Sequence, residues 1–85
     1  MLDLDASSSH LYPGARLRVL SGEGPDAVIR FADGASATAR IAGARLSVEG
    51  YVTRAGTKIA ATVWEVDGSE EEIRVRAKLR IDGDP

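Results

Sequence analysis

The strongest constraint on the fold is the stretch from Ile73 to Ile81, which reads IRVRAKLRI. Apolar and basic residues alternate along it without a break. At a period of two residues, all the apolar side chains fall on one face and all the basic side chains on the other. At the period of a helix, the apolar positions would be divided between two sides. The alternation therefore predicts an extended strand with one apolar face and one cationic face.

A helix is the local alternative for this segment. Ser69 and Glu72 have the spacing of a capping box, and Glu70 and Arg74 form a favourable i,i+4 pair. Ile and Val favour strands, however, and only the two-residue period separates the two kinds of side chain completely. We therefore expect a strand here.

Short apolar stretches divided by turn residues occupy the rest of the chain. They predict strands at residues 15–20, 27–32, 35–41, 42–53 and 58–66. Asp33-Gly34 is typical of a tight hairpin with a type I′ turn, and Gly50 within an apolar stretch indicates a bulge or a sharp bend. Five to six short strands predict an all-β fold, either a small barrel or a strongly bent antiparallel sheet, SH3-like or OB-like. Closure would protect edges that a flat sheet of this size leaves exposed.

We expect one domain, because 85 residues leave no room for two cores. Residues 1–10 are acidic and Ser-rich, with little to bury beyond Leu2 and Leu4, so they are expected to form a flexible tail. The β domain is expected at residues 11–82, followed by a frayed terminus at residues 83–85. The first nine residues lack a basic start and a long apolar run, so neither a signal peptide nor a membrane anchor is expected. The chain has no Cys, which fits a cytoplasmic protein without disulfides.

The charged residues are unevenly distributed, although the formal net charge is only −2. The expected strands carry most of the Arg and Lys residues and only two acids, Glu49 and Glu65, whereas the turns and tails carry the other acids. Solvation alone explains such a pattern, because long cationic side chains cover apolar surface and protect sheet edges. The alternative is a cationic surface for an anionic partner, since alternate residues of one strand lie about 6.6 Å apart, near the spacing of phosphates.

A candidate partner surface combines the basic stretch with other cations and two aromatic residues. Its members are Arg74, Arg76, Lys78, Arg80, Arg16, Arg18, Trp64 and Tyr51. The strand pattern sets Trp64 on the side opposite Val63. It is therefore either an exposed anchor for a partner or a plug at one end of the barrel.

The sequence contains no convincing motif for catalysis or for binding a cofactor. The segment GEGPDA, residues 22–27, formally matches a dinucleotide-binding motif, but a strand follows it where a helix is required. His10 is the only histidine, and without Cys it cannot complete a tetrahedral zinc site. No spacing singles out two acids for a shared cleft. We therefore expect no enzymatic activity, no cofactor and no metal.

The function favoured by these features is a non-enzymatic β-barrel interaction module that binds a protein partner or a second copy of itself. The alternative is a nucleic-acid-binding barrel that contacts RNA or a single strand through its basic strand faces. Few aromatic residues are present to stack on bases, and acidic turns would repel a long polyanion. No membrane partner is expected.

Overall fold

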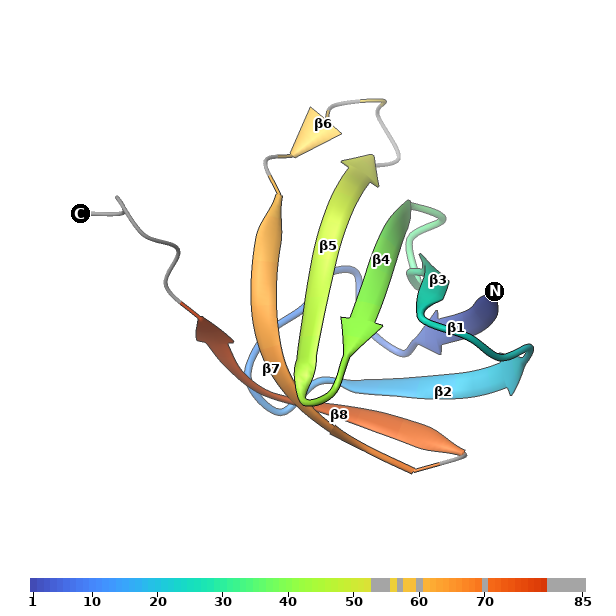
Figure 1. Ribbon diagram of the computed structural model, residues 1–85. Coiled ribbons are helices and arrows are strands. Elements are labelled where there is room, and N and C mark those ends of the chain that lie inside the picture. Colours follow the sequence, from blue (N-terminus) through green and yellow to red (C-terminus); the bar gives the residue numbers. More distant parts are fainter. Residues whose placement is uncertain (53–55, 57, 60, 70, 80–85) are drawn as a thin grey trace.

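The computed structural model describes residues 1–52, 56, 58–59, 61–69 and 71–79 (Figure 1). This part of the chain contains strands and no helix. The strands are β1 (Leu2–Ala6), β2 (Arg16–Ser21), β3 (Asp26–Arg30), β4 (Ser36–Ala42), β5 (Arg45–Val52), β6 (Lys58–Ile59), β7 (Thr62–Gly68) and β8 (Glu72–Leu79).

Seven of these strands close a barrel in the order β4-β3-β1-β2-β8-β7-β5, because β5 pairs back with β4. The short strand β6 pairs with the end of β5, outside the ring. The expected small all-β barrel is confirmed, with more strands than the five to six expected and more than the five of an OB-fold. The strand expected at residues 58–66 is divided into β6 and β7, which both pair with β5.

The first strand corrects the expectation of a flexible tail at residues 1–10. β1 lies between β2 and β3, antiparallel to the first and parallel to the second. Leu4 is 0% exposed and Ala6 is also buried. Five residues of alternation are a weak sequence signal, yet this strand joins two parts of the sheet and is required for closure. The sheet is therefore mixed and not wholly antiparallel. Residues 83–85, where fraying was expected, lie outside the described residues.

The hairpin expected at Asp33-Gly34 is confirmed, but its turn differs from type I′. Gly34 has a φ of 91°, while no described non-glycine residue has a positive φ. Gly34 N–H donates to the carbonyl of Phe31 at 3.1 Å, and Phe31 N–H donates to the carbonyl of Ala35 at 2.9 Å. The loop therefore has three residues, and Gly34 takes its single left-handed position. The carboxylate of Asp33 accepts a further bond from the N–H of Ala35 at 3.0 Å.

Three bulges interrupt the ladders within the described part of the barrel. The extra residues are Leu20 opposite β1, Glu49 opposite β4 and Arg76 opposite β7. The second bulge lies next to Gly50, as the sequence indicates. Bulges increase local twist and bend the strand that carries them, which helps a small sheet to close.

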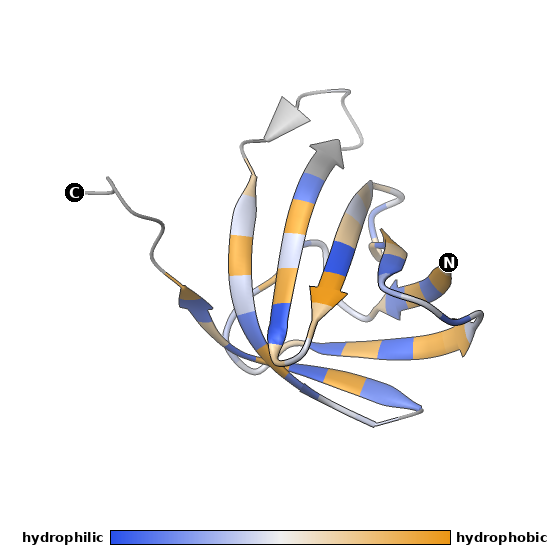
Figure 2. Cartoon of the chain, viewed as in Figure 1, coloured by the Kyte–Doolittle hydropathy of each residue, from blue (hydrophilic) through white to orange (hydrophobic). Residues whose placement is uncertain are grey.

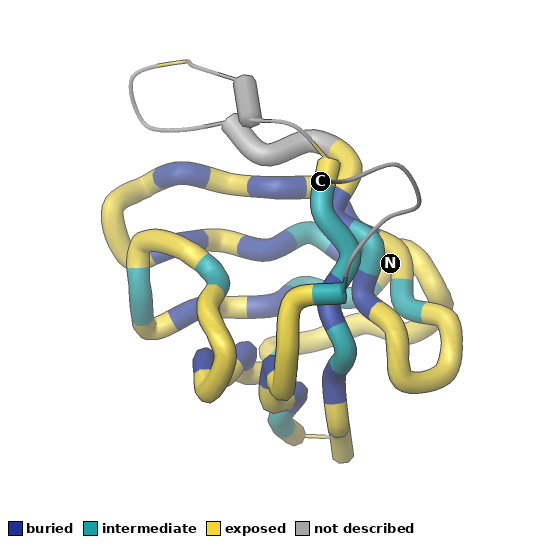
Figure 3. The backbone as a smooth tube through the Cα atoms, turned by 90° about the vertical axis from the view of Figure 1, so that its left-hand side faces the viewer, coloured by how far each residue is buried: buried dark blue, intermediate teal, exposed yellow. Residues whose placement is uncertain are grey.

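The core consists mainly of the inward-facing residues of the seven closing strands, and Ala15, Phe31 and Ala35 join it from the segments between strands. Alternating apolar and polar bands run along the strands, and buried and exposed residues alternate in the same way (Figures 2 and 3). Many of the buried residues are alanines, so Leu4, Leu17, Ile29, Leu46 and Trp64 supply much of the buried apolar area. No polar or charged side chain is buried among the described residues.

Candidate interaction surface

The last strand, β8, has two differently paired halves. Over residues 72–75, the closed half, it lies between β7 and β2, with Leu17 opposite Ile73. Val75 ends this half, because its N–H donates to the carbonyl of Ala15 and its carbonyl accepts from the N–H of Gly14, both at 2.8 Å. Over residues 76–79, the open half, β7 is the only described strand that pairs with β8. In Figure 1, β2 runs to the right from the region where it meets β8, whereas the end of β8 continues to the left.

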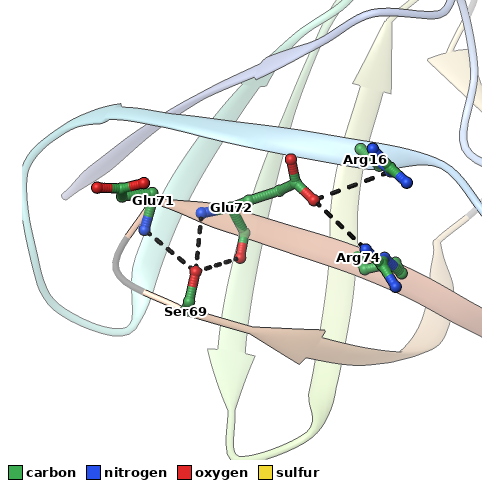
Figure 4. Close-up of polar contacts among 5 residues, drawn as sticks. All are labelled: Arg16, Ser69, Glu71, Glu72 and Arg74. Carbon is green, nitrogen blue, oxygen red and sulfur yellow. Dashed lines mark hydrogen bonds and ion pairs between the residues drawn. The ribbon is translucent and has the colours of Figure 1, made fainter.

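The turn before β8 excludes the helix alternative. Ser69 N–H donates to the carbonyl of Glu72 at 2.8 Å, which closes the β7–β8 hairpin. The Ser69 hydroxyl accepts from the N–H groups of Glu71 and Glu72 at 3.4 and 3.3 Å (Figure 4). These are bonds that a helix cap would also make, but a strand follows them. The expected strand is confirmed for residues 72–79.

The closed half of β8 carries charges of both signs on its outer side. The Oε1 atom of Glu72 lies 3.9 Å from Arg16 Nε and 3.9 Å from Arg74 Nη2 (Figure 4). Arg18 lies opposite Glu72 on β8 and opposite Asp5 on β1. All these side chains are accessible to water, so each ion pair is worth about 0–1 kcal/mol. Cations and anions therefore lie side by side in this part of the sheet, although two cations, Arg16 and Arg74, are directly opposite each other.

The same mixture of signs extends around the barrel. Arg30 Nε lies 3.2 Å from Asp3 Oδ1, and Arg40 Nε lies 3.2 Å from Asp26 Oδ1. The expected separation of cationic strands from acidic turns is therefore wrong. Strand acids that the sequence pattern assigned to turns or to the tail are Asp3, Asp5, Asp26, Asp67 and Glu72. The strands extend further into the predicted turns than expected, and β1 had not been recognised as a strand.

A bulge at Arg76 changes which residues of the open half face outward. Glu65 lies opposite Ala77 and Val66 lies opposite Val75, so Arg76 is the extra residue between the two pairs. Residues directly opposite in an antiparallel pair share a face. Beyond the bulge, Lys78 is therefore on the face of buried Trp64, while half-buried Leu79 is on the outer face. The expectation of one apolar and one cationic face holds only as far as Val75.

The two aromatic candidates have different outcomes. Trp64 is only 7% exposed, and its indole N–H donates to Thr62 Oγ1 at 3.0 Å. It belongs to the core and is not an exposed anchor, because the inward-facing residues of β7 are Trp64 and Val66 while Val63 is half-buried. Tyr51 pairs through its backbone with Ala37 on β4, and its side chain lies outside the described part.

The structure divides the remaining candidates between the two halves of β8. Arg16, Arg18 and Arg74 gather around Glu72 at the closed half. Arg76 and Lys78 belong to the open half, where Arg76 Nη1 lies 3.8 Å from Glu65 Oε1. Arg80 lies outside the described residues. The expected continuous cationic row is therefore not formed over residues 74–78.

The open edge of β8 was missed by sequence analysis, and its main-chain geometry follows from the bonds around it. Val66 N–H donates to the carbonyl of Ala44, toward β5, at 2.7 Å. Because main-chain directions alternate along a strand, Trp64 also directs its N–H and C=O toward β5. Lys78 lies opposite Trp64, so its own N–H and C=O point away from β7, toward the open edge. The sequence IRVRAKLRI contains no residue, such as Gly, that would have indicated a bulge here.

Other features of the described residues offer no built site for a ligand. A shallow depression over the closed half has both acids and bases in its lining, which consists of Asp5, Ser7, Arg16, Arg18, Glu71 and Glu72. No group of three or more His, Cys, Asp or Glu residues within the described residues is arranged to hold a metal ion. A search of the same part of the chain finds no helix with the length and hydropathy needed to cross a membrane.

Comparisons with known proteins do not assign the chain to a family. No family model matches it, and no curated protein or solved structure matches it at a significant level. A function for this barrel is therefore inferred from its geometry.

Proposed function

We propose that this barrel is a non-enzymatic interaction module that binds an extended segment of a protein partner along the open half of β8. The proposal rests on the register of β7 and β8, from which it follows that the main-chain N–H and C=O of Lys78 face an edge that no described strand covers. Such an edge is a template for strand addition, in which main-chain hydrogen bonds supply affinity and alternate side chains supply specificity. The described edge is short, so we expect a weak, transient complex.

The side chains around this edge also support a binding role. Lys78 and Ala77 are exposed, and Leu79 lies half-buried opposite half-buried Val63 on the outer face. An added strand would therefore meet a cation on one face and apolar side chains on the other. These side chains would therefore contribute contacts to a bound strand in addition to the main-chain hydrogen bonds.

A protein partner is favoured over a second copy of the chain. Antiparallel pairing of two β8 strands around a two-fold axis would bring their cations close to one another. Like charges at opposed positions destabilise strand pairs. A bulge and a Lys at an exposed edge are also devices by which proteins avoid self-pairing. Analytical ultracentrifugation over a range of concentrations tests this point, and dimerisation lost in Lys78→Pro would favour the second copy.

A nucleic-acid partner has less support. Most exposed cations of the strands lie beside an Asp or a Glu, which weakens the field that a polyanion would meet, although Arg16 and Arg74 lie directly opposite each other. Trp64 is buried and cannot stack on a base. Titration with short RNA at two salt concentrations is the test, since phosphate binding would weaken steeply with salt.

We also propose a non-catalytic role and a cytoplasmic location. The described residues bury no polar or charged side chain, whereas acid–base catalysis uses titratable groups placed in a cleft with shifted pKa values. The absence of Cys suits a reducing compartment.

Amide spectra recorded with a panel of short extended peptides test the proposed function. The panel consists of capped pentapeptides Ser-Val-X-Val-Ser, in which X is Glu, Gln or Lys. We expect at least one of them to shift the amide signals of residues 76–79. The same peptide with N-methyl groups on its edge-facing amides should not bind, because it cannot donate main-chain bonds.

Lys78→Pro provides the matched change in the protein. It removes the N–H at the open edge, and Pro is tolerated where that N–H faces solvent. Binding should be lost while the core signals of the spectrum remain. If no peptide shifts residues 76–79, or if the N-methylated peptide binds as well as its parent, the proposed function is wrong.

A further inference from the structure

We infer that the segment recognised at this edge carries an acidic residue flanked by apolar residues. This inference rests on the proposed function and names the chemistry of its partner. It starts from the electrostatic surroundings of Lys78, which differ from those of the other strand cations.

Lys78 is alone among the strand cations with described side chains in lacking both an ion pair and an acid opposite it. Ion pairs within 4.0 Å hold Arg16, Arg30, Arg40, Arg74 and Arg76. Arg18 and Arg45 have no such pair, but each has an acid opposite it in the sheet. Arg18 lies opposite Asp5 and Glu72, and Arg45 lies opposite Glu65. Trp64 is the residue opposite Lys78. The barrel therefore supplies a neighbouring anion to every one of these cations except Lys78.

The position of Lys78 in the ladder fixes where an incoming anion would lie. Its N–H and C=O face the edge, so the residue of an added strand that bonds to them lies directly opposite Lys78. The side chains of such a pair lie on the same face, about 5.5 Å apart between Cα atoms. A Glu or Asp at this partner position would reach the Lys78 ammonium group and complete the charge pairing that the barrel leaves open.

The neighbours of that acidic residue would contact apolar side chains. The residues before and after it face the opposite side of the added strand. On that side β8 presents Ala77 and Leu79, and Val63 lies beside Leu79 on β7. Apolar residues at both flanking positions would extend this patch. The recognised pattern is thus apolar, acidic, apolar over three consecutive residues.

The Ser-Val-X-Val-Ser peptides measure this preference directly. At low salt, the Glu peptide should bind about two- to fivefold more tightly than the Gln peptide, as expected for one accessible ion pair. The Lys peptide should bind more weakly than both. The difference between the Glu and Gln peptides should shrink at high salt, because screening weakens accessible charge pairs.

Two variants that each remove one positive charge test which cation causes the preference for the Glu peptide. Lys78→Gln should make the Glu and Gln peptides bind equally while residues 76–79 still shift. Arg18→Gln is the matched control, because it also removes one exposed cation without an ion pair but lies on β2. It should leave the preference unchanged.

The outcomes separate this inference from the proposed function. If all three peptides shift residues 76–79 with equal affinity, the edge binds strands and the acidic preference is wrong. If Arg18→Gln abolishes the preference as fully as Lys78→Gln, the charge responsible is not at the edge and the inference also fails. If no peptide binds, the proposed function falls and the inference falls with it.

Discussion

The two halves of β8 share one alternating pattern but have different surroundings. In the closed half, Ile73 and Val75 are buried and β8 has a strand on each side. In the open half, the bulge at Arg76 reverses the faces, Ala77 is exposed, and only β7 is paired. The comparison teaches that alternation specifies an extended backbone, whereas the neighbours of the strand decide which side chains become core.

The largest effect should come from the same substitution placed in each half. Val75→Asp would bury a carboxylate at a site that is 1% exposed, and we expect a loss of about 3–5 kcal/mol, enough to unfold a small domain. Ala77→Asp, two residues further along, should cost less than about 1 kcal/mol because Ala77 is exposed. Urea unfolding followed by circular dichroism measures both. Equal losses for the two variants would show that the halves are not different.

A second comparison uses two residues that lie opposite each other. Trp64→Ala should destabilise the barrel by about 3–5 kcal/mol, because it removes the largest side chain of the core and leaves a cavity. Lys78→Ala, at the opposite position of β8, should change the free energy of unfolding by less than about 0.5 kcal/mol. A small loss for Trp64→Ala would contradict its position inside the barrel.

Hydrogen exchange should distinguish the two halves without any substitution. The N–H of Val75 bonds to the carbonyl of Ala15, so it should exchange only on large-scale opening of the barrel. The N–H of Lys78 faces the open edge and should exchange at least about 100-fold faster. Exchange measured by NMR tests this difference, and a peptide that pairs with the edge should slow exchange at Lys78. Strong protection of Lys78 in the free protein would mean that the edge is already covered.

The smallest effect concerns the charge cluster of the closed half. Glu72→Gln removes the carboxylate that lies near both Arg16 and Arg74, and the expected loss is below about 1 kcal/mol at low salt. The loss should decrease further at high salt. Glu71→Gln is the control, since Glu71 is exposed and none of the ion pairs of the described residues includes it. A loss well above about 1 kcal/mol for Glu72→Gln would contradict this expectation and would mean that these ion pairs stabilise the fold more than accessible pairs usually do.

Strong local signals in the sequence predicted several elements correctly. The strand at residues 72–79, the bulge beside Gly50 and the hairpin at Asp33-Gly34 each follow from side-chain period or glycine chemistry. The sequence did not predict β1, because its five residues gain their buried contacts from β2 and β3, which lie elsewhere in the chain. It also did not predict how the charges pair, because ion pairs such as that between Arg30 and Asp3 join residues 27 positions apart.

The sequence by itself determined that this chain is all-β, that β8 is extended, and that a turn falls at Asp33-Gly34. These properties depend on side-chain alternation and on the conformations open to individual residues, which are local. Only the tertiary structure decided that Trp64 is buried, that most strand cations lie beside acids, and that β8 leaves an open edge at Lys78. Strand pairing and bulges decide these features, and they depend on contacts between residues distant in the chain.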